Sequence, residues 1–230
     1  KLWGEMLLRS RNLSRQCQSL IADATPAHAR LGLIDVRVRM IFRTIAFAHA
    51  LRHLLRDEVP APELQNLLLA SEWQQLQSAS NKPDFLMLNM GKDLGLCLKE
   101  GRLDSCLAGS IDATLSAMTA ASASCERIKS TPIPFSYTLL LHRTAYLYCF
   151  LLPFGLVDSI GFMTPFVVAI VAYTFFGLDA LGDEIEEPFG LDANDLPLDA
   201  ICRTIEINLR ESLGDDNVPE PLAPVNYCLT

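Results

Sequence analysis

Two ionisable residues, His142 and Arg143, interrupt an otherwise apolar run of sequence that begins at Ile133. An arginine at the centre of a bilayer costs about 2.5–3.5 kcal/mol, so it normally faces a partner or a water-filled cavity. One interpretation is therefore an ion pathway through these intramembrane polar residues. The other is that the helix starts below the membrane, so that His142 and Arg143 lie at the cytosolic interface, snorkelling or paired with acids.

The acidic segment between Asp179 and Asp199 is the second candidate for chemistry, with Asp192 and Asp195 as its central pair. Calcium prefers several oxygen ligands from a short flexible stretch, which this segment could supply, although it lacks the spacing of an EF-hand. Asp195 also precedes Leu196-Pro197, and Asp and Pro are favoured around a helix start. We therefore predict a helix N-cap at Asp195 first and a calcium site, the one cofactor indicated, second.

His49 and His53 lie four residues apart, a spacing that can hold a metal ion on one helix face. No third ligand accompanies them, so we interpret them as part of a polar helix face. The seven cysteines are odd in number and include no CxxC pair, which indicates free thiols in a reducing compartment. The chain has no nucleophile elbow, P-loop, HExxH or GxGxxG motif, so we expect no enzymatic activity.

Two apolar runs lie back to back over residues 133–178. The second, from Ile160 to Leu178, carries no charge, and both are long enough to cross the membrane, which takes roughly 20 apolar residues. Because only Gly155 to Ser159 separates the runs, we predict a helical hairpin that crosses the membrane twice. Arg127 and Lys129, just before it, agree with both flanks being cytosolic. A buried hairpin in a soluble domain is the competing interpretation, which a chargeless run of this length disfavours.

The rest of the sequence predicts helices only. Apolar residues recur at steps of three and four over residues 34–48 and again over 107–128, a spacing typical of a helix with one buried stripe. The fold class is therefore all-α: a membrane helical hairpin plus long cytosolic helices. We predict helices, in addition to the hairpin, over residues 1–21, 30–58, 63–79, 84–99, 105–129 and 198–213.

The same pattern predicts three regions along the chain. Residues 1–132 form a mostly cytosolic helical region, residues 133–178 the transmembrane hairpin, and residues 179–230 an acidic corner, a C-terminal helix and a tail. The tail is acidic and rich in proline, so we expect it to be mobile or draped on a neighbour. The chain begins with Lys1-Leu2 and has no signal-peptide pattern, so we expect it to start inside a helix of a longer protein.

The charge balance argues against nucleic acid as a partner. The 19 Lys and Arg residues face 27 Asp and Glu residues, giving a net charge of −8. No basic excess is available to neutralise phosphates. The mean hydropathy of +0.23 is mild for a polytopic membrane protein and high for a soluble one, because it averages a polar-faced region with a lipid-like one.

Several long motifs resemble the bacterial homologues of bestrophin. They are Cys125-Glu126-Arg127-Ile128-Lys129-Ser130-Thr131-Pro132-Ile133-Pro134-Phe135-Ser136-Tyr137-Thr138, Leu141-His142-Arg143-Thr144, Met163-Thr164-Pro165-Phe166, Pro188-Phe189-Gly190 and Asn194-Asp195-Leu196-Pro197-Leu198-Asp199-Ala200-Ile201-Cys202. The opening Lys1-Leu2-Trp3-Gly4 resembles the segment just after the pore-lining neck helix of that family. The similarity extends over essentially the whole chain.

This resemblance implies a homopentameric ion channel of the cell (inner) membrane, with multiple membrane segments and its helical bulk in the cytoplasm. Its partners would be membrane lipid, further copies of the chain and permeant ions. Eukaryotic relatives are calcium-activated chloride channels, so the implied function is a chloride or anion channel. Two alternatives stay open: a sodium-conducting bacterial channel, and a membrane-anchored helical scaffold without transport activity.

The resemblance also implies positions for functional residues. The first membrane helix and the neck of the family would precede Lys1. The cytosolic pore constriction of the family corresponds to Thr131, Pro132 and Ile133. The calcium clasp of eukaryotic relatives uses carboxylates two and five positions after a Pro-Phe-Gly motif, which are Asp192 and Asp195 here. The acids between them are replaced by Ala193 and Asn194, a departure from the clasp.

Overall fold

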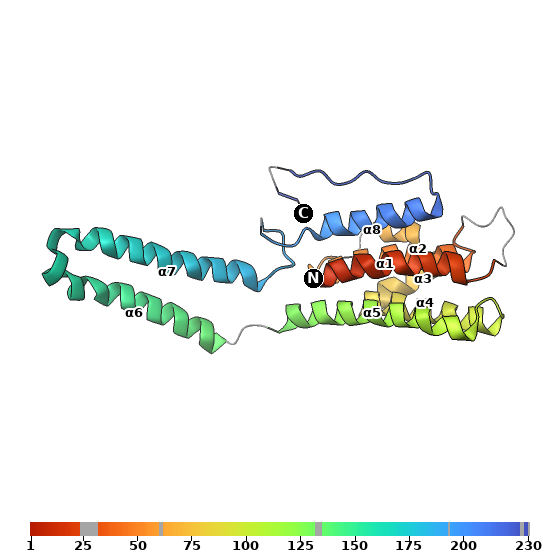
Figure 1. The fold of residues 1–230 in the computed structure, drawn as a ribbon, viewed down its shortest axis with the longest axis horizontal. Coiled ribbons are helices and arrows are strands. Elements are labelled where there is room, and N and C mark those ends of the chain that lie inside the picture. The colour runs from red at the N-terminus through yellow and green to blue at the C-terminus, as the bar shows by residue number, and fades with distance from the viewer. Residues whose placement is uncertain (24–31, 60–61, 132–134, 193, 226–227, 230) are drawn as a thin grey trace. The chain divides into compact units, whose positions relative to one another are not determined.

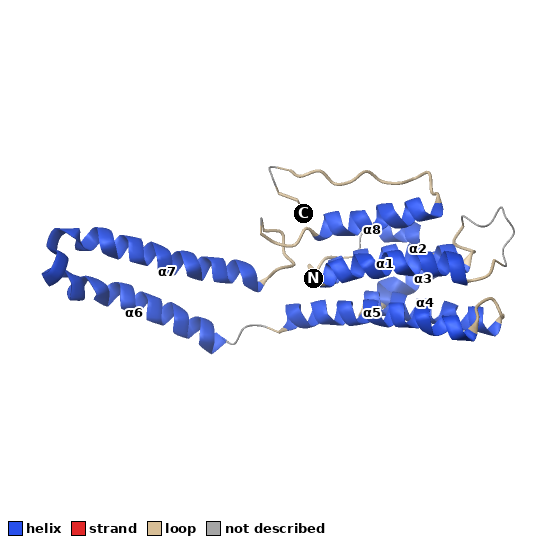
Figure 2. Ribbon diagram, in the orientation of Figure 1, coloured by secondary structure: helices blue, strands red, loops and turns tan. Residues whose placement is uncertain are grey.

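The computed structural model describes residues 1–23, 32–59, 62–131, 135–192, 194–225 and 228–229. Apart from one bridge between Val225 and Cys228, the regular structure in these ranges is helical (Figure 2). The all-α fold class is therefore confirmed. The elements, labelled in Figure 1, are α1 (Leu2–Leu20), α2 (Val36–Leu55), η2 (Pro62–Leu67), α3 (Ala70–Ser78), α4 (Lys82–Lys99), α5 (Ser105–Ser130), α6 (Phe135–Ile160), η3 (Gly161–Met163), α7 (Thr164–Glu186) and α8 (Leu198–Leu213).

The chain divides into two compact units. One, here called the bundle, comprises Lys1–Arg127 together with Pro197–Thr230, so that α8 returns to the N-terminal helices. The other, here called the hairpin unit, comprises Ile128–Leu196 and contains α6, η3 and α7. The largest buried side chains, such as those of Leu13, Phe47 and Met90, belong to the bundle, so the apolar core of the described chain lies there.

Helix α2 is the centre of the bundle and contacts α1, α4, α8 and η2. It begins at Val36 because Asp35 caps it, its carboxylate accepting a hydrogen bond from the backbone N–H of Arg37 at 2.9 Å. The predicted single buried stripe is wrong for this helix, since Arg43 and Arg52 are buried as well as its apolar residues. A helix surrounded by neighbours has no solvent face, so its charged residues need partners inside the bundle.

Other boundaries follow local signals. The predicted helix over residues 63–79 is divided into η2 and α3, because Leu69 adopts an extended conformation between them. Helix α8 ends at Gly214, whose φ of 68° is the left-handed conformation typical of a helix C-terminus.

The hairpin unit consists of two long antiparallel helices joined by a tight turn (Figure 1). The predicted loop at Gly155–Ser159 is wrong, because α6 continues to Ile160 and the chain turns at Gly161–Met163. Gly161 has a φ of 53°, and the Thr164 hydroxyl donates to the Gly161 carbonyl at 2.7 Å. Asp158 and Ser159 therefore mark the last turn of a helix rather than a loop.

Candidate functional site

The surface of the hairpin unit is apolar. The segment Leu139–Gly182, which spans most of α6 and α7, is long and apolar enough to cross a membrane, and only 6% of its most apolar window is buried. Rings of the two helices meet between them, with centroids 5.0 Å apart for Tyr146 and Phe176 and 5.4 Å apart for Tyr148 and Phe175. Many of the other large side chains are exposed, Phe154 at 69% among them, as in a helix pair solvated by lipid.

His142 and Arg143 have different surroundings, although they are adjacent in α6. His142 Nε2 lies 2.9 Å from Asp179 Oδ2 of α7, close enough for an ion pair, but the ring is not aligned for a hydrogen bond. Arg143 is exposed, and among the described residues no acid lies within 4 Å of its guanidinium. Asp179 thus supplies the acid partner that the sequence left open for His142.

The depth of this pair follows from helix geometry. His142 precedes the end of α6 by 18 residues, which corresponds to about 27 Å along the helix axis, and Asp179 is about 22 Å from the start of α7. The hydrocarbon layer is about 30 Å thick, so a hairpin whose turn reaches one surface places this pair near the other. The geometry therefore favours an interfacial position over the centre of the bilayer.

The segment that the resemblance assigns to the pore constriction joins α5 to α6. Thr131 follows directly after the end of α5 and is exposed. Pro132 and Ile133 lie outside the described residues. A role of these residues in narrowing a pore stays a prediction.

The acidic segment between α7 and α8, here called the acidic corner, is held in its turn by hydrogen bonds among its own residues. Asp195 Oδ2 accepts a hydrogen bond from the Asp192 backbone N–H at 2.8 Å, and the Leu196 N–H donates to the Pro188 carbonyl at 3.0 Å. The predicted N-cap at Asp195 is wrong, because α8 starts at Leu198 with Pro197 as its N-cap and has no side-chain capping bond. Asp195 instead stabilises a turn within the corner, as Asp side chains commonly do.

No metal centre is evident in the part of the chain that the structure describes. It contains no group of three or more His, Cys, Asp or Glu side chains arranged to hold an ion. Asp192 and Asp195 are brought together, but the Asp195 carboxylate is directed at a backbone N–H. Calcium at this corner stays a prediction, for which a carboxylate oxygen would have to leave its present hydrogen bond.

The interpretation of His49 and His53 as a polar helix face is wrong, because both are 4% exposed inside the bundle. His49 lies 3.5 Å from both Glu63 and Glu206, and His53 lies 3.0 Å from Glu58. Sequence reasoning missed these acids because none of them belongs to α2: Glu58 and Glu63 follow its end, and Glu206 lies on α8. The signal that could have found them was the density of basic residues along α2, which requires acids nearby.

Two further clusters neutralise the arginines of α2. Arg52 Nη1 lies 2.7 Å from Asp199 Oδ1, and Arg56 Nη1 lies 2.5 Å from Asp199 Oδ2, which joins α2 to the first turn of α8. Arg43 Nε lies 2.7 Å from Glu72 Oε1, and its Nη1 lies 2.6 Å from Asp93 Oδ2, which joins α2 to α3 and α4. Asp199 lies in the first turn of α8, where the helix dipole also favours an acid.

The basic residues around Glu63 and Glu206 lower the pKa values of these two acids. A hydrogen bond from His53 and the charges of His49 and Arg52 outweigh burial and lower the pKa of Glu63 to about 2. Burial raises the pKa of Glu206, but the hydrogen bond from His49 and the pair with Arg210 outweigh it, so that its pKa lies below its usual value. Both acids are ionised at neutral pH and hold the bundle together as anions.

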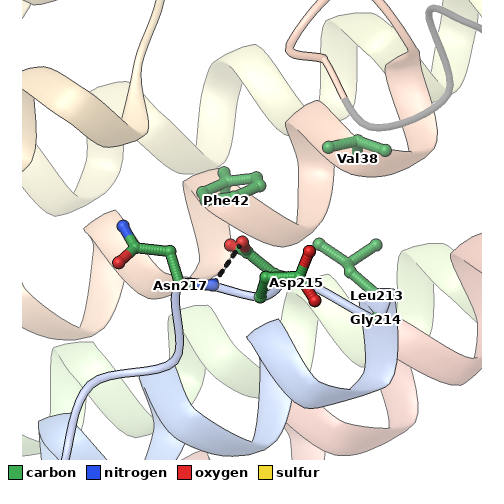
Figure 3. A pocket seen from close by; sticks show the side chains of 7 residues that line it. Val38, Phe42, Leu213, Gly214, Asp215 and Asn217 are labelled. Atoms are coloured by element: carbon green, nitrogen blue, oxygen red, sulfur yellow. Dashed lines mark hydrogen bonds between the residues drawn. The ribbon is translucent and has the colours of Figure 1, made fainter.

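A small pocket of about 290 Å³ lies between α2 and the residues that follow α8 (Figure 3). Val38 and Phe42 contribute its apolar side, and Asp215 contributes a carboxylate that accepts a hydrogen bond from the Asn217 N–H at 3.0 Å. The same carboxylate lies 2.8 Å from Arg210 Nη1, so its charge is already compensated. The pocket is therefore a structural feature of the α8 terminus rather than a site of chemistry.

The cysteines behave as the sequence predicts. All seven lie in the described ranges and are free thiols. Burial raises the pKa of Cys17 and of Cys202 to about 12, so both are protonated and unreactive at neutral pH. Cys106 and Cys228 are exposed.

Comparison with known proteins gives a consistent result. A family model described as Bacterial/Fungal Bestrophin protein matches residues 1–211. The voltage-dependent anion channel-forming protein YneE of Escherichia coli K12 is 40% identical over 226 residues, covering 97% of this chain and 70% of that protein. A voltage-dependent anion channel-forming protein of Mesorhizobium japonicum is 42% identical over 215 residues, covering 94% of this chain and 66% of that protein.

Solved structures agree with the sequence relatives. The crystal structure of a bacterial bestrophin homologue from Klebsiella pneumoniae superimposes with a TM-score of 0.82 at 38% identity, covering 93% of this chain and 76% of that one. Fold, family model and sequence identity thus point to one assignment. The chain belongs to the bacterial and fungal bestrophin family.

Proposed function

We propose that this chain is a subunit of an anion channel in the cell membrane. The observation that carries the proposal is the 40% identity, over 97% of the chain, to a protein named as forming a voltage-dependent anion channel. The apolar, outward-facing hairpin supports it, because a channel subunit needs a segment stable in lipid. The names of the relatives are those of channels and not of enzymes, in agreement with the lack of catalytic motifs in the sequence.

The finer features of the proposal concern topology and assembly. The hairpin crosses the membrane twice, with the Gly161–Met163 turn outside and the bundle in the cytoplasm. Arg127 and Lys129 near its start and the lone Asp158 near its turn support this orientation through the positive-inside rule. The subunits assemble as a homopentamer in the inner membrane, and Thr131, Pro132 and Ile133 narrow its pore.

Chloride flux from liposomes tests the proposal. The purified full-length protein is placed in vesicles that are loaded with a high chloride concentration. These vesicles should release chloride once a cation ionophore is added, because the ionophore removes the membrane potential that chloride efflux would otherwise build up. Protein-free vesicles provide the background. Chloride release equal to that background, from protein shown to be folded by circular dichroism and inserted in the bilayer, would favour a membrane-anchored scaffold instead.

A further inference from the structure

An open groove follows one face of α6 in the hairpin unit. It has a volume of about 510 Å³ and is lined by Thr144, Leu147, Tyr148, Leu151, Gly155 and Leu156, among others. These positions recur at steps of three and four, so they belong to one helix face. Because most of them are apolar and the groove opens to the surface of the hairpin, it suits a long, flexible hydrocarbon.

Gly155 keeps one end of this groove open. A Cβ atom at this position would meet no other atom within 4 Å, so the space beside the glycine is empty of protein. In an α-helix a glycine costs about 1 kcal/mol relative to alanine, and this one brings no close packing within the described chain in return. The glycine therefore leaves room for a group that is not part of the described chain.

Arg143 lies just before the residues that line the groove and is not one of them. It precedes Leu147 by one helical turn, so the two side chains are neighbours on the same ridge. His142 lies close to Asp179, whereas Arg143 is exposed and has no acid within 4 Å among the described residues. A cation at the membrane boundary is stabilised by an anion, and a guanidinium binds phosphate through two parallel hydrogen bonds.

The distance between Arg143 and Gly155 matches the thickness of one leaflet. Twelve residues separate Arg143 from Gly155, which corresponds to about 18 Å along the helix, whereas half of the hydrocarbon layer is about 15 Å. A molecule with an anionic head at the interface and an acyl chain that descends one leaflet would therefore meet Arg143 and the groove together. Phospholipids have this form, and they surround any membrane hairpin.

We propose that the α6 groove binds one acyl chain of an anionic glycerophospholipid whose phosphate is held by Arg143. The proposal rests on the hairpin crossing the membrane, as in the proposed function. It assigns three roles: Arg143 selects the phosphate, Leu147 and Leu151 contact the chain, and Gly155 provides the space for its end. The lipid would lie on the cytosolic leaflet.

Lipid binding to the full-length protein in detergent tests this site. Native mass spectrometry would count the molecules bound per subunit during titration with phosphatidylglycerol and, separately, with a diacylglycerol of the same acyl chains. The variant Arg143→Gln should weaken phosphatidylglycerol binding about tenfold, the effect of one lost charge-assisted contact, and leave diacylglycerol binding unchanged. Arg143→Lys should restore much of the phosphatidylglycerol affinity.

A second variant tests the groove. Gly155→Leu should weaken the binding of both lipids, because it fills the space that the chain occupies. Two matched controls should bind both lipids as the wild type does: Arg11→Gln, an exposed bundle arginine with no acid within 4 Å among the described residues, and Gly182→Leu, an exposed glycine of α7.

Two results would overturn the lipid site. One is unchanged phosphatidylglycerol binding in both Arg143→Gln and Gly155→Leu. The other is a drop from oligomer to single chain in either variant with the lipid count per chain unchanged, which would assign the groove to a contact between copies. Chloride flux from the same preparations tests the channel separately from the lipid site. If the protein conducts chloride but the two variants bind lipid as the wild type does, only the lipid site is rejected. If the variants bind less lipid but the wild type conducts no chloride, only the channel is rejected.

Discussion

Asp195 Oδ2 lies 2.6 Å from the position that a Cβ atom on Gly190 would occupy. The same oxygen accepts the hydrogen bond from the Asp192 N–H at 2.8 Å. A side chain at position 190 would therefore displace the Asp195 carboxylate, which is one of the groups that hold the acidic corner after α7 together.

The first prediction concerns this contact. Gly190→Ala should lower the free energy of unfolding by about 0.5–1.5 kcal/mol, because the Asp195 carboxylate must swing away and lose its hydrogen bond. Asp195→Ala should have a similar effect, and the double variant should be no less stable than Asp195→Ala alone, since both changes remove the same bond. Gly182→Ala, where a Cβ meets no atom within 4 Å, is the control and should not destabilise. Additive losses in the double variant would contradict this account of the corner.

The second prediction concerns the core of the bundle. Arg43→Met should cost about 3 kcal/mol or more, because Glu72 and Asp93 lose the cation they share in a buried site. Chemical denaturation would measure the loss. Arg9→Ala, which breaks the partly buried pair with Glu5 on α1, should change stability by less than about 1 kcal/mol. Equal effects of the two substitutions would show that the Arg43 cluster is not a buried network.

The third prediction is a pH dependence. The pKa of Glu63 is about 2 in the folded state, below the 4.5 of an unperturbed Glu, so the unfolded chain binds a proton first as the pH falls. The stability that Glu63 contributes is therefore complete above about pH 4.5 and is lost progressively toward pH 2. Glu63→Gln should make the melting temperature fall less steeply between pH 5 and pH 3. Glu5→Gln is the control, and a slope unchanged by Glu63→Gln would contradict the prediction.

The fourth prediction concerns the orientation of the hairpin. In a protein whose accessible thiols Cys106, Cys149 and Cys228 are replaced by serine, Ser159→Cys should react with a membrane-impermeant maleimide added outside intact cells. Ser130→Cys should react only after permeabilisation. Cys17 and Cys202 should stay silent in both cases, because they are buried and protonated. Labelling of Ser130→Cys alone would reverse the orientation.

Much of the fold could be predicted from the sequence where the signal is local. Helix α8 has the predicted bounds, Leu198–Leu213, because an acidic first turn and a terminal glycine mark them. The hairpin was evident from composition, but its turn was not. Gly155 and Asp158 suggested a loop, whereas the conformation that reverses the chain requires the positive φ of Gly161.

The candidate site was less predictable, because its contacts join residues far apart in sequence. His142 was recognised as unusual, but Asp179 lies on the other helix of the hairpin, and no pattern within α6 reveals it. His49 and His53 were assigned to a polar face because Glu63 and Glu206 become their neighbours only when η2 and α8 pack against α2. Pairings of this kind depend on tertiary structure rather than on spacing.

The reversal potential of the full-length protein tests the central claim most directly. In a planar bilayer with a tenfold gradient of NaCl, an anion channel should reverse close to the Nernst potential of chloride, and replacing chloride by a large impermeant anion on one side should shift that potential. The scaffold alternative predicts no current above that of the bare bilayer. A reversal potential close to that of sodium would contradict the account and assign the protein to cation conduction.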